Sequence, residues 1–136
     1  MRVSLDIEGL DDMISQLERK GKDLQKVTPK ALRAGGRILA QGMKDEVPVS
    51  DIDHVHIRDD IKVRQTPKKD RPIPDVITFD IGPGKETAWR ARFVHDGFVA
   101  ANGRFVRGNP FAVRAFRIKK EQIVQAIARE YQKAMR

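Results

Sequence analysis

The sequence predicts an α+β fold in which a small antiparallel or mixed sheet packs against two N-terminal helices and a long C-terminal helix. Three patterns lead to this prediction. Apolar residues recur at helical spacing through most of the first 47 residues, alternate with polar residues over 75–82, and return to helical spacing after Pro110. A chain of 136 residues has the usual length of one domain, so we expect a single domain over 1–136.

The N-terminal part predicts a strand followed by two helices. Alternating apolar residues indicate a strand over 3–7, and helical spacing indicates a first helix from about 11 to 26, with Gly21 as a weak point. The pair Thr28-Pro29 is typical of a helix start, because threonine caps free N–H groups and proline fits the first turn. We therefore expect the second helix to run from there to about Glu46.

The second helix has two contrasting sides. One side is apolar and has two glycines close by, which would let another backbone approach: Leu32, Leu39, Met43 and Val47, with Gly35 and Gly36. The other side is basic: Lys30, Arg33, Arg37 and Lys44, with Gln41. This stripe is either a solvated face or a ridge that faces an anion.

The middle of the chain alternates polar connections with short strands. We expect a connection over 48–60, a strand over 61–65 and a second strand over 75–82. Between the strands, 66–74 contains three prolines and four charges, which predicts a flexible proline-rich loop or a disordered flap.

The C-terminal part predicts a short element, a turn and a long helix. The segment 89–97 is read as a strand or a short helix, and 103–110 as a short strand that ends in a turn. From about Pro110 the apolar residues share one arc of a helix: Phe116, Ile123, Val124, Ile127, Tyr131 and Ala134. Arg129, Lys133 and Arg136 lie opposite as a second basic ridge.

Charge and composition limit the function classes. The net charge is +8, and residues 101–136 contribute +7 of it. This asymmetry suggests a polyanion or an acidic protein as partner, and the alternative is that the charge only keeps the protein soluble. The absence of cysteine excludes disulfides, thiolate catalysis and cysteine-bound zinc. No apolar run approaches the length of a membrane span, so no membrane association is predicted.

The segment WRARFVHDGF places His95 and Asp96 side by side, a grouping found in active sites. Adjacent residues of an extended strand point to opposite faces, although a turn would leave their geometry open. The chain also lacks a Gly-x-Ser-x-Gly motif or a comparable nucleophile signature. We therefore predict no enzyme, no catalytic residues and no cofactor.

Two other groups have a candidate function and a structural alternative. His54 and His56 are weak metal candidates among aspartates, and the alternative is a solvated, partly ion-paired loop. Trp89 and Phe93 stand among arginines, as in a surface that stacks on bases, and the favoured alternative is core packing.

Taken in order, five segments resemble the small tail-component family of long-tailed bacteriophages and prophages, whose members act as head–tail joining or tail-completion proteins at the neck. They are IEGLDDMISQLER, KDEVPV, DDIKV, WRARFVHDGF and NPFAVRAF. In the fourth segment the family pattern is matched by Trp89, Phe93, Val94 and Gly97, and in the fifth by Pro110 and Phe111. The chain departs from the pattern after VPV, where Thr-Gly is missing and Asp60 replaces a serine, and at His95 and Phe98, where glutamate and threonine are frequent.

The resemblance implies a structural virion protein of the phage neck. It implies a homo-oligomeric ring around the DNA path, contacts with other neck and tail proteins, and assembly in the host bacterial cytoplasm. The signature residues would then pack or turn the chain, with His95 and Asp96 at a surface or subunit contact. The basic ridges would face the DNA or an acidic partner without reading its sequence. The alternatives are a small basic protein that binds nucleic acid without sequence preference and, third, a metal-dependent enzyme at His54 and His56.

Overall fold

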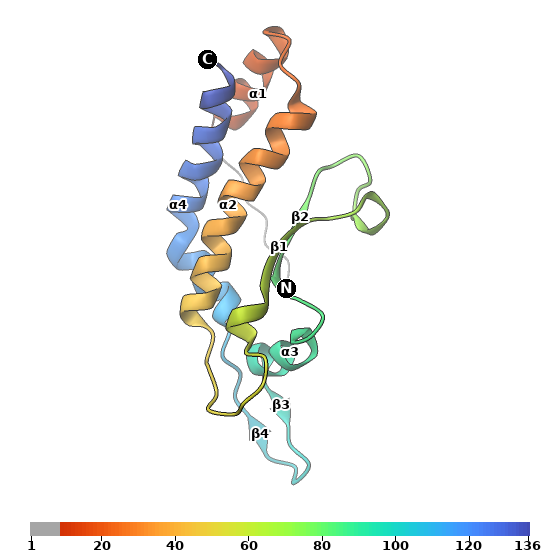
Figure 1. Cartoon of the computed structure of the whole chain (residues 1–136), viewed down its shortest axis with the longest axis vertical. Coiled ribbons are helices and arrows are strands. Elements are labelled where there is room, and N and C mark those ends of the chain that lie inside the picture. Colours follow the sequence, from red (N-terminus) through yellow and green to blue (C-terminus); the bar gives the residue numbers. More distant parts are fainter. Residues whose placement is uncertain (1–8) are drawn as a thin grey trace.

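The computed structural model describes residues 9–136, and the strand predicted over 3–7 lies outside this range. The fold is α+β, as predicted (Figure 1). Two antiparallel two-stranded sheets accompany the helices. The elements in chain order are α1 (Leu10–Arg19), α2 (Leu24–Glu46), β1 (Ile61–Gln65), β2 (Phe79–Pro83), α3 (Ala88–Asp96), β3 (Phe98–Val99), β4 (Phe105–Val106) and α4 (Phe111–Ala134).

The boundary between the first two helices differs from the prediction. α1 ends at Arg19, and α2 begins at Leu24 instead of Pro29. Gly21 takes a positive φ of 72°, and the Asp23 carboxylate caps α2 by accepting a hydrogen bond from the Gln25 amide at 2.9 Å. A glycine break followed by an aspartate cap therefore places the helix start earlier, and Pro29 lies inside the helix.

α2 and α4 pack along most of their length, and two glycines of α2 make room for neighbours on two sides. A Cβ atom at Gly35 would lie 2.9 Å from Ile127 Cγ1 of α4. A Cβ atom at Gly36 would lie 3.1 Å from Val63 Cγ1 of β1. Side chains of the neighbouring elements, and not their backbones as predicted, make the closest contacts at these glycines. α2 lies between α4 and the β1–β2 sheet (Figure 1).

The first sheet pairs β1 with β2, from Ile61 opposite Pro83 to Gln65 opposite Phe79. The observed strand β2 therefore begins and ends later than the strand predicted over 75–82, which it extends by one residue at the end. Val76 is exposed, and β1 ends at Gln65, so the first residues of the predicted strand have no partner strand to pair with.

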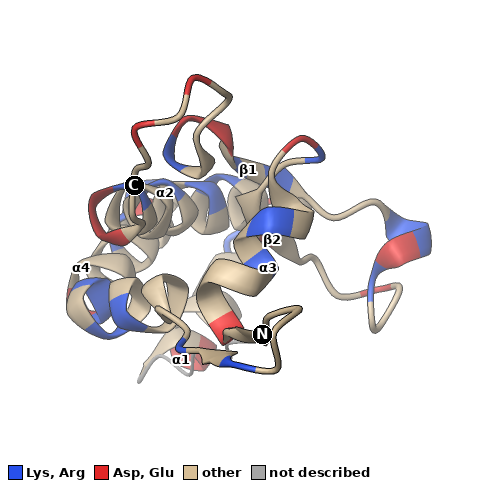
Figure 2. Cartoon of the chain, turned by 90° about the horizontal axis from the view of Figure 1, so that it is seen from below, with Lys and Arg blue, Asp and Glu red and all other residues tan. Residues whose placement is uncertain are grey.

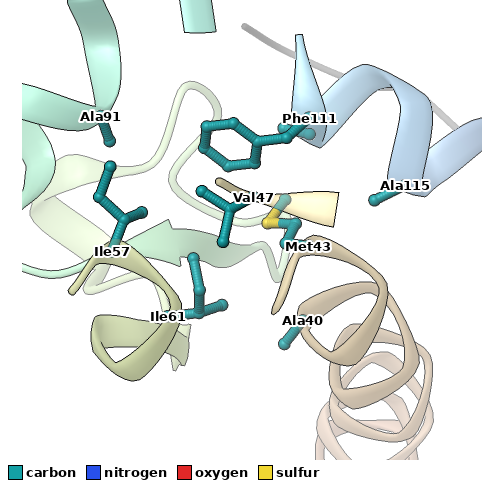
Figure 3. Packing of buried hydrophobic residues seen from close by; sticks show 9 residues of the cluster. Ala40, Met43, Val47, Ile57, Ile61, Ala91, Phe111 and Ala115 are labelled. Carbon is teal, nitrogen blue, oxygen red and sulfur yellow. The ribbon is translucent and has the colours of Figure 1, made fainter. Parts of the chain in front are cut away.

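The buried residues form two clusters along the α2–α4 pair. The first gathers around Phe111, Met43, Val47 and Ile61, which converge from α4, the end of α2 and β1 (Figure 3). The second is built from the other ends of the helices: Leu17, Ala31, Ile123, Ile127 and Tyr131. Leu39 packs against both clusters and joins them.

The proline-rich loop 66–74 has internal hydrogen bonds. It contains a 3₁₀ turn over Lys68–Asp70. The Arg71 guanidinium donates to the carbonyl oxygens of Thr66 at 3.0 Å and Pro74 at 3.2 Å. Its predicted flexibility stays a prediction. Within the described range, no helix has both the length and the apolar character needed to span a membrane.

Candidate functional site

The segment that carries the family signature forms helix α3, one of the two predicted alternatives. Ala91 is buried and Val94 packs against the first cluster, so this side of the helix faces the core. Trp89 is 65% exposed and Phe93 is 48% exposed. The expectation that Trp89 and Phe93 pack into the core is therefore wrong, because a helix of nine residues that buries one side leaves the other in solvent.

Two glycines allow the chain to cross itself after α3. Gly97 has a φ of 81°, and a Cβ atom there would lie 2.6 Å from the Val106 carbonyl oxygen. A Cβ atom at Gly108 would lie 2.5 Å from the His95 carbonyl oxygen. The predicted turn at Gly97 is confirmed. The crossing leads through Pro110 to Phe111, which begins α4 and is 2% exposed.

His95 and Asp96 form a pair at the end of α3. His95 Nδ1 and Asp96 Oδ1 lie 2.7 Å apart, because the helical turn brings together two side chains that a strand would separate. This hydrogen bond holds the pKa of Asp96 below its ordinary value. His95 Nε2 is buried without a hydrogen-bond partner, and the ring meets Phe111 edge-on at 5.3 Å. A general base would need this nitrogen to reach a substrate, so the geometry does not favour catalysis.

α3 and the β3–β4 hairpin lie at one end of the molecule (Figure 1). Together they carry a cluster of exposed apolar residues. We call this cluster the aromatic–arginine surface. Its apolar members are Trp89, Phe93, Phe98, Val99, Phe105 and Val106, each 39–68% exposed. The exposed arginines of the same elements are Arg92, Arg104 and Arg107. Phe93 and Phe98 meet edge to face at 5.8 Å, which joins the helix to the hairpin.

At the same end, the connection between α2 and β1 forms a second exposed surface, residues 49–59, which we call the acidic segment. Its exposed apolar residues are Val49, Ile52 and Val55, and its acids are Asp51, Asp53 and Asp59. Arg90 of α3 donates a hydrogen bond to the Val55 carbonyl and holds the segment against the fold.

The weak metal candidates lie in the acidic segment. The His54 and His56 rings are 5.1 Å apart, and His54 Nε2 lies 3.2 Å from the Ser50 hydroxyl. Partial burial and the Arg90 charge lower the pKa of His54, and the charges of its other neighbours contribute less. Among residues 9–136, no three His, Cys, Asp or Glu side chains come together in a way that could hold a metal ion.

The basic ridge of α2 is only partly exposed. Lys30 and Arg37 are exposed, whereas Arg33 is half-buried with its guanidinium 5.3 Å from the centre of the Phe79 ring. Lys44 is also half-buried and lines a shallow hollow with Arg58 and acidic neighbours. Two of the four predicted ridge residues are therefore available to a distant anion without rearrangement.

The basic ridge of α4, which Arg136 extends beyond the end of the helix at Ala134, is exposed. Arg129, Lys133 and Arg136 are exposed, and Lys133 pairs with Glu130 at 3.3 Å. Figure 2 shows lysines and arginines along α4 and several acids on the connection beside α2 and β1, with other acids elsewhere on the molecule.

An open groove of about 1130 Å³ lies between α2, the β1–β2 sheet and the proline-rich loop. Its lining mixes apolar Leu39 and Ile81 with charged Arg64, Asp80 and Lys85. Arg64 and Asp80 pair with each other at 3.2 Å across the sheet. The charged groups of the groove are in part already neutralised within the chain.

Sequence reasoning missed two polar contacts that position these surfaces. Asp60 is buried and accepts hydrogen bonds from Thr87, the residue that directly precedes α3. Arg114 of α4 donates to Glu46 Oε2 and to Asn109 Oδ1, each at 2.7 Å, and so ties the end of α2 to the start of α4. The one signal in the sequence was Asp60 in a position where the family pattern has serine, another short hydrogen-bonding side chain.

Comparison with known families assigns the chain to a class. A family model described as "Bacteriophage HK97-gp10, putative tail-component" matches residues 11–97, from α1 to the end of α3. The match includes Trp89, Phe93 and Gly97 but ends before the hairpin and α4, so Pro110 and Phe111 lie outside it. No curated protein and no solved structure matches the chain. With well over half of its residues matched, the chain belongs to the HK97 gp10-like family of bacteriophage tail components.

Proposed function

We propose that the chain acts at the phage neck, where it joins or completes the tail at the head–tail junction as an oligomeric ring around the DNA path. The observation that carries this proposal is the family match over residues 11–97. A tail component works in contact with other tail proteins, and a large exposed apolar surface is what such contacts require. The aromatic–arginine surface supplies one.

The ridge of α4 fits the DNA path. Arg129 and Lys133 are exposed side chains of α4, and the exposed Arg136 follows its end. Point charges of this kind attract phosphates without selecting bases. A genome that slides through a ring needs such weak attraction. In this proposal the ridge of α2 contributes less. Two of its four basic residues, Arg33 and Lys44, are half-buried, so only Lys30 and Arg37 are exposed. His95 and Asp96 are at the margin of a subunit contact and carry out no catalysis.

The test is deletion of the gene from an inducible phage or prophage, followed by negative-stain electron microscopy of the lysate. Separate full heads and tails, or tails of abnormal length, support the neck role. Normal infectious particles overturn it.

The role of the α4 ridge needs its own variant. Arg129→Glu with Lys133→Glu should allow particles to form but reduce DNA delivery. Arg117→Glu with Lys120→Glu is the control, because both are exposed basic residues on other sides of α4 and the change in charge is the same. Unchanged delivery by the ridge variant overturns DNA contact through this ridge. Tight, salt-sensitive DNA binding by the isolated protein instead favours the alternative of a small nucleic-acid-binding protein.

A further inference from the structure

We propose that the aromatic–arginine surface of one copy binds the acidic segment of a second copy in a head-to-tail contact. The proposal rests on the proposed function, because it names the contact that would link copies into a ring. Its occupant is a second copy of this chain, and the argument uses apolar exposure, charge and position.

Both surfaces expose apolar side chains that the fold does not cover. Trp89, Val99 and Phe105 are 65–68% exposed on the first surface. Ile52 is 66% exposed on the second, with Val49 and Val55 beside it at 44% and 47%. Contiguous exposed apolar residues surrounded by polar ones are typical of protein interfaces, where aromatic residues and arginines contribute most of the binding energy.

The two surfaces have opposite charge. Residues 89–107 contain four arginines against Asp96, a net charge of +3, and residues 49–59 contain three aspartates against Arg58, a net charge of −2. None of the ion pairs among residues 9–136 involves Arg92, Arg104 or Arg107, nor Asp51 or Asp53. These charges are therefore available to a partner, and opposite charge around apolar centres favours the pairing of the two surfaces.

The position of the surfaces favours a contact between copies. Both lie at the same end of the molecule, and the chain already joins them at their margin through Arg90 and the Val55 carbonyl (Figure 1). The hairpin nevertheless projects beyond this contact and leaves both apolar clusters exposed. Two different surfaces that pair in one direction only produce a heterologous contact, which forms a ring when the rotation closes, whereas a reciprocal pairing would stop at a dimer.

Nucleic acid fits the aromatic–arginine surface less well. The Phe93 and Phe98 rings stand at 73° to each other, so they do not form a parallel platform for successive bases. Asp51 and Asp53, at the same end, would also repel phosphate groups.

Cysteine crosslinking tests the contact directly, because the chain has no cysteine of its own. Ile52→Cys and Val99→Cys are introduced together into particles, which are treated with a short bis-maleimide and analysed on a denaturing gel. A head-to-tail ring gives a ladder of multimers. The single variants give no ladder, and neither does Ser15→Cys with Val99→Cys, since Ser15 is an exposed residue of α1 outside both surfaces.

A crosslink from Val99→Cys to a different virion protein, a dimer without higher bands, or no crosslink at all overturns the proposal. The gene deletion separates the two ideas. Detached heads and tails on deletion, together with an absent ladder, leave the neck role in place and remove only this contact. Normal particles on deletion remove the neck role.

Charge reversal supplies an independent check. Arg104→Glu with Arg107→Glu, or Asp51→Lys with Asp53→Lys, should abolish the multimer ladder when combined with the crosslinking cysteines. All four substitutions together should restore it, because attraction is re-established with reversed sign. Lys26→Glu with Arg117→Glu, both exposed and outside the two surfaces, should leave the ladder intact. A ladder that persists in either reversed pair, or stays absent in the combined variant, contradicts the pairing.

Discussion

Asp60 and Thr87, 27 residues apart, form a buried pair in which Asp60 Oδ2 accepts two hydrogen bonds. One comes from the Thr87 amide at 3.2 Å and the other from the Thr87 hydroxyl at 2.9 Å. Gly84 approaches so closely that a Cβ atom there would lie 2.8 Å from Asp60 Oδ1. The pair fixes the start of α3 against β1, and through α3 it sets the position of Trp89 and the hairpin.

Asp60→Ala should lower the free energy of unfolding by about 1–3 kcal/mol, because it leaves the buried Thr87 hydroxyl without a partner and the Thr87 amide with only a 3.3 Å hydrogen bond to the Gly84 carbonyl. Urea denaturation measures this change. Asp59→Ala is the matched control, since the neighbouring side chain is 58% exposed, and it should change stability by no more than about 0.5 kcal/mol. Equal effects of the two substitutions would show that the buried pair contributes nothing specific.

Gly97→Ala should destabilise the protein more than Gly103→Ala. Both glycines have nearly the same positive φ, 81° and 82°, so alanine is strained at both, by roughly 1–2 kcal/mol. At Gly97 the new Cβ atom would also meet the Val106 carbonyl oxygen and the Gly108 nitrogen, whereas nothing lies within 4 Å at Gly103. Thermal unfolding of the two variants measures the difference, and similar melting temperatures would refute the close crossing.

Gly35→Ala should destabilise the protein relative to Gly42→Ala. Alanine favours the helix at both positions by up to about 1 kcal/mol. At Gly35 the new Cβ atom meets Ile127, which is 5% exposed and cannot move aside. At Gly42 the tightest neighbour is the flexible side chain of Lys119, at 3.0 Å. Denaturation midpoints in urea rank the variants, and the reverse order would mean that the helices separate easily.

The pKa of Asp96 should lie below its ordinary value of 3.8, chiefly because of the hydrogen bond to His95. His95→Phe should raise this pKa toward 3.8, as measured by NMR titration. A carboxylate with a lowered folded pKa stabilises the fold above its unfolded pKa. This contribution is lost as the pH falls through the folded pKa. The acid limb of stability should therefore be shallower in Asp96→Asn, and an identical limb would show that the pair does not influence folding.

Trp89 should report the exposure of α3, because it is the only tryptophan of the chain. At 65% exposure its fluorescence in the dilute protein should resemble that of an indole in water and be quenched readily by acrylamide. Formation of the proposed contact should shift the emission to shorter wavelength and protect it from the quencher. Emission that is already short in wavelength and protected at the highest dilution would mean that Trp89 packs as the sequence alone suggested.

Most of the fold could be predicted from periodicity. The long helices, β1 and the start of α4 at Pro110 follow from apolar spacing and from proline, which are local signals. The start of α2 could not be predicted as easily, because Thr28-Pro29 is a good start signal in isolation. Thr28 instead shares a hydrogen bond with the Tyr131 hydroxyl at 2.9 Å, a contact between residues far apart in the sequence.

The candidate surfaces were harder to predict than the fold. Trp89 and Phe93 are large apolar residues of the kind that usually lies in the core. They are exposed because α3 turns its other side toward the core. The ridge on α2 illustrates the same difficulty, because Arg33 lies on the predicted stripe yet turns onto Phe79. Helical spacing gives the angle of a residue around its helix but does not tell which neighbouring element covers that angle.

The glycines of α2 also bear on how this protein can diverge during evolution. The helix is approached by α4 at Gly35 and by the sheet at Gly36, so a larger side chain at either position displaces a neighbouring element. A substitution at Gly35 must be compensated in α4, and one at Gly36 in the sheet. The tip of the hairpin has no such neighbour, since nothing lies within 4 Å of a Cβ atom at Gly103. The packing of the chain therefore restricts change more strongly at the helical centre than at the tip of the hairpin.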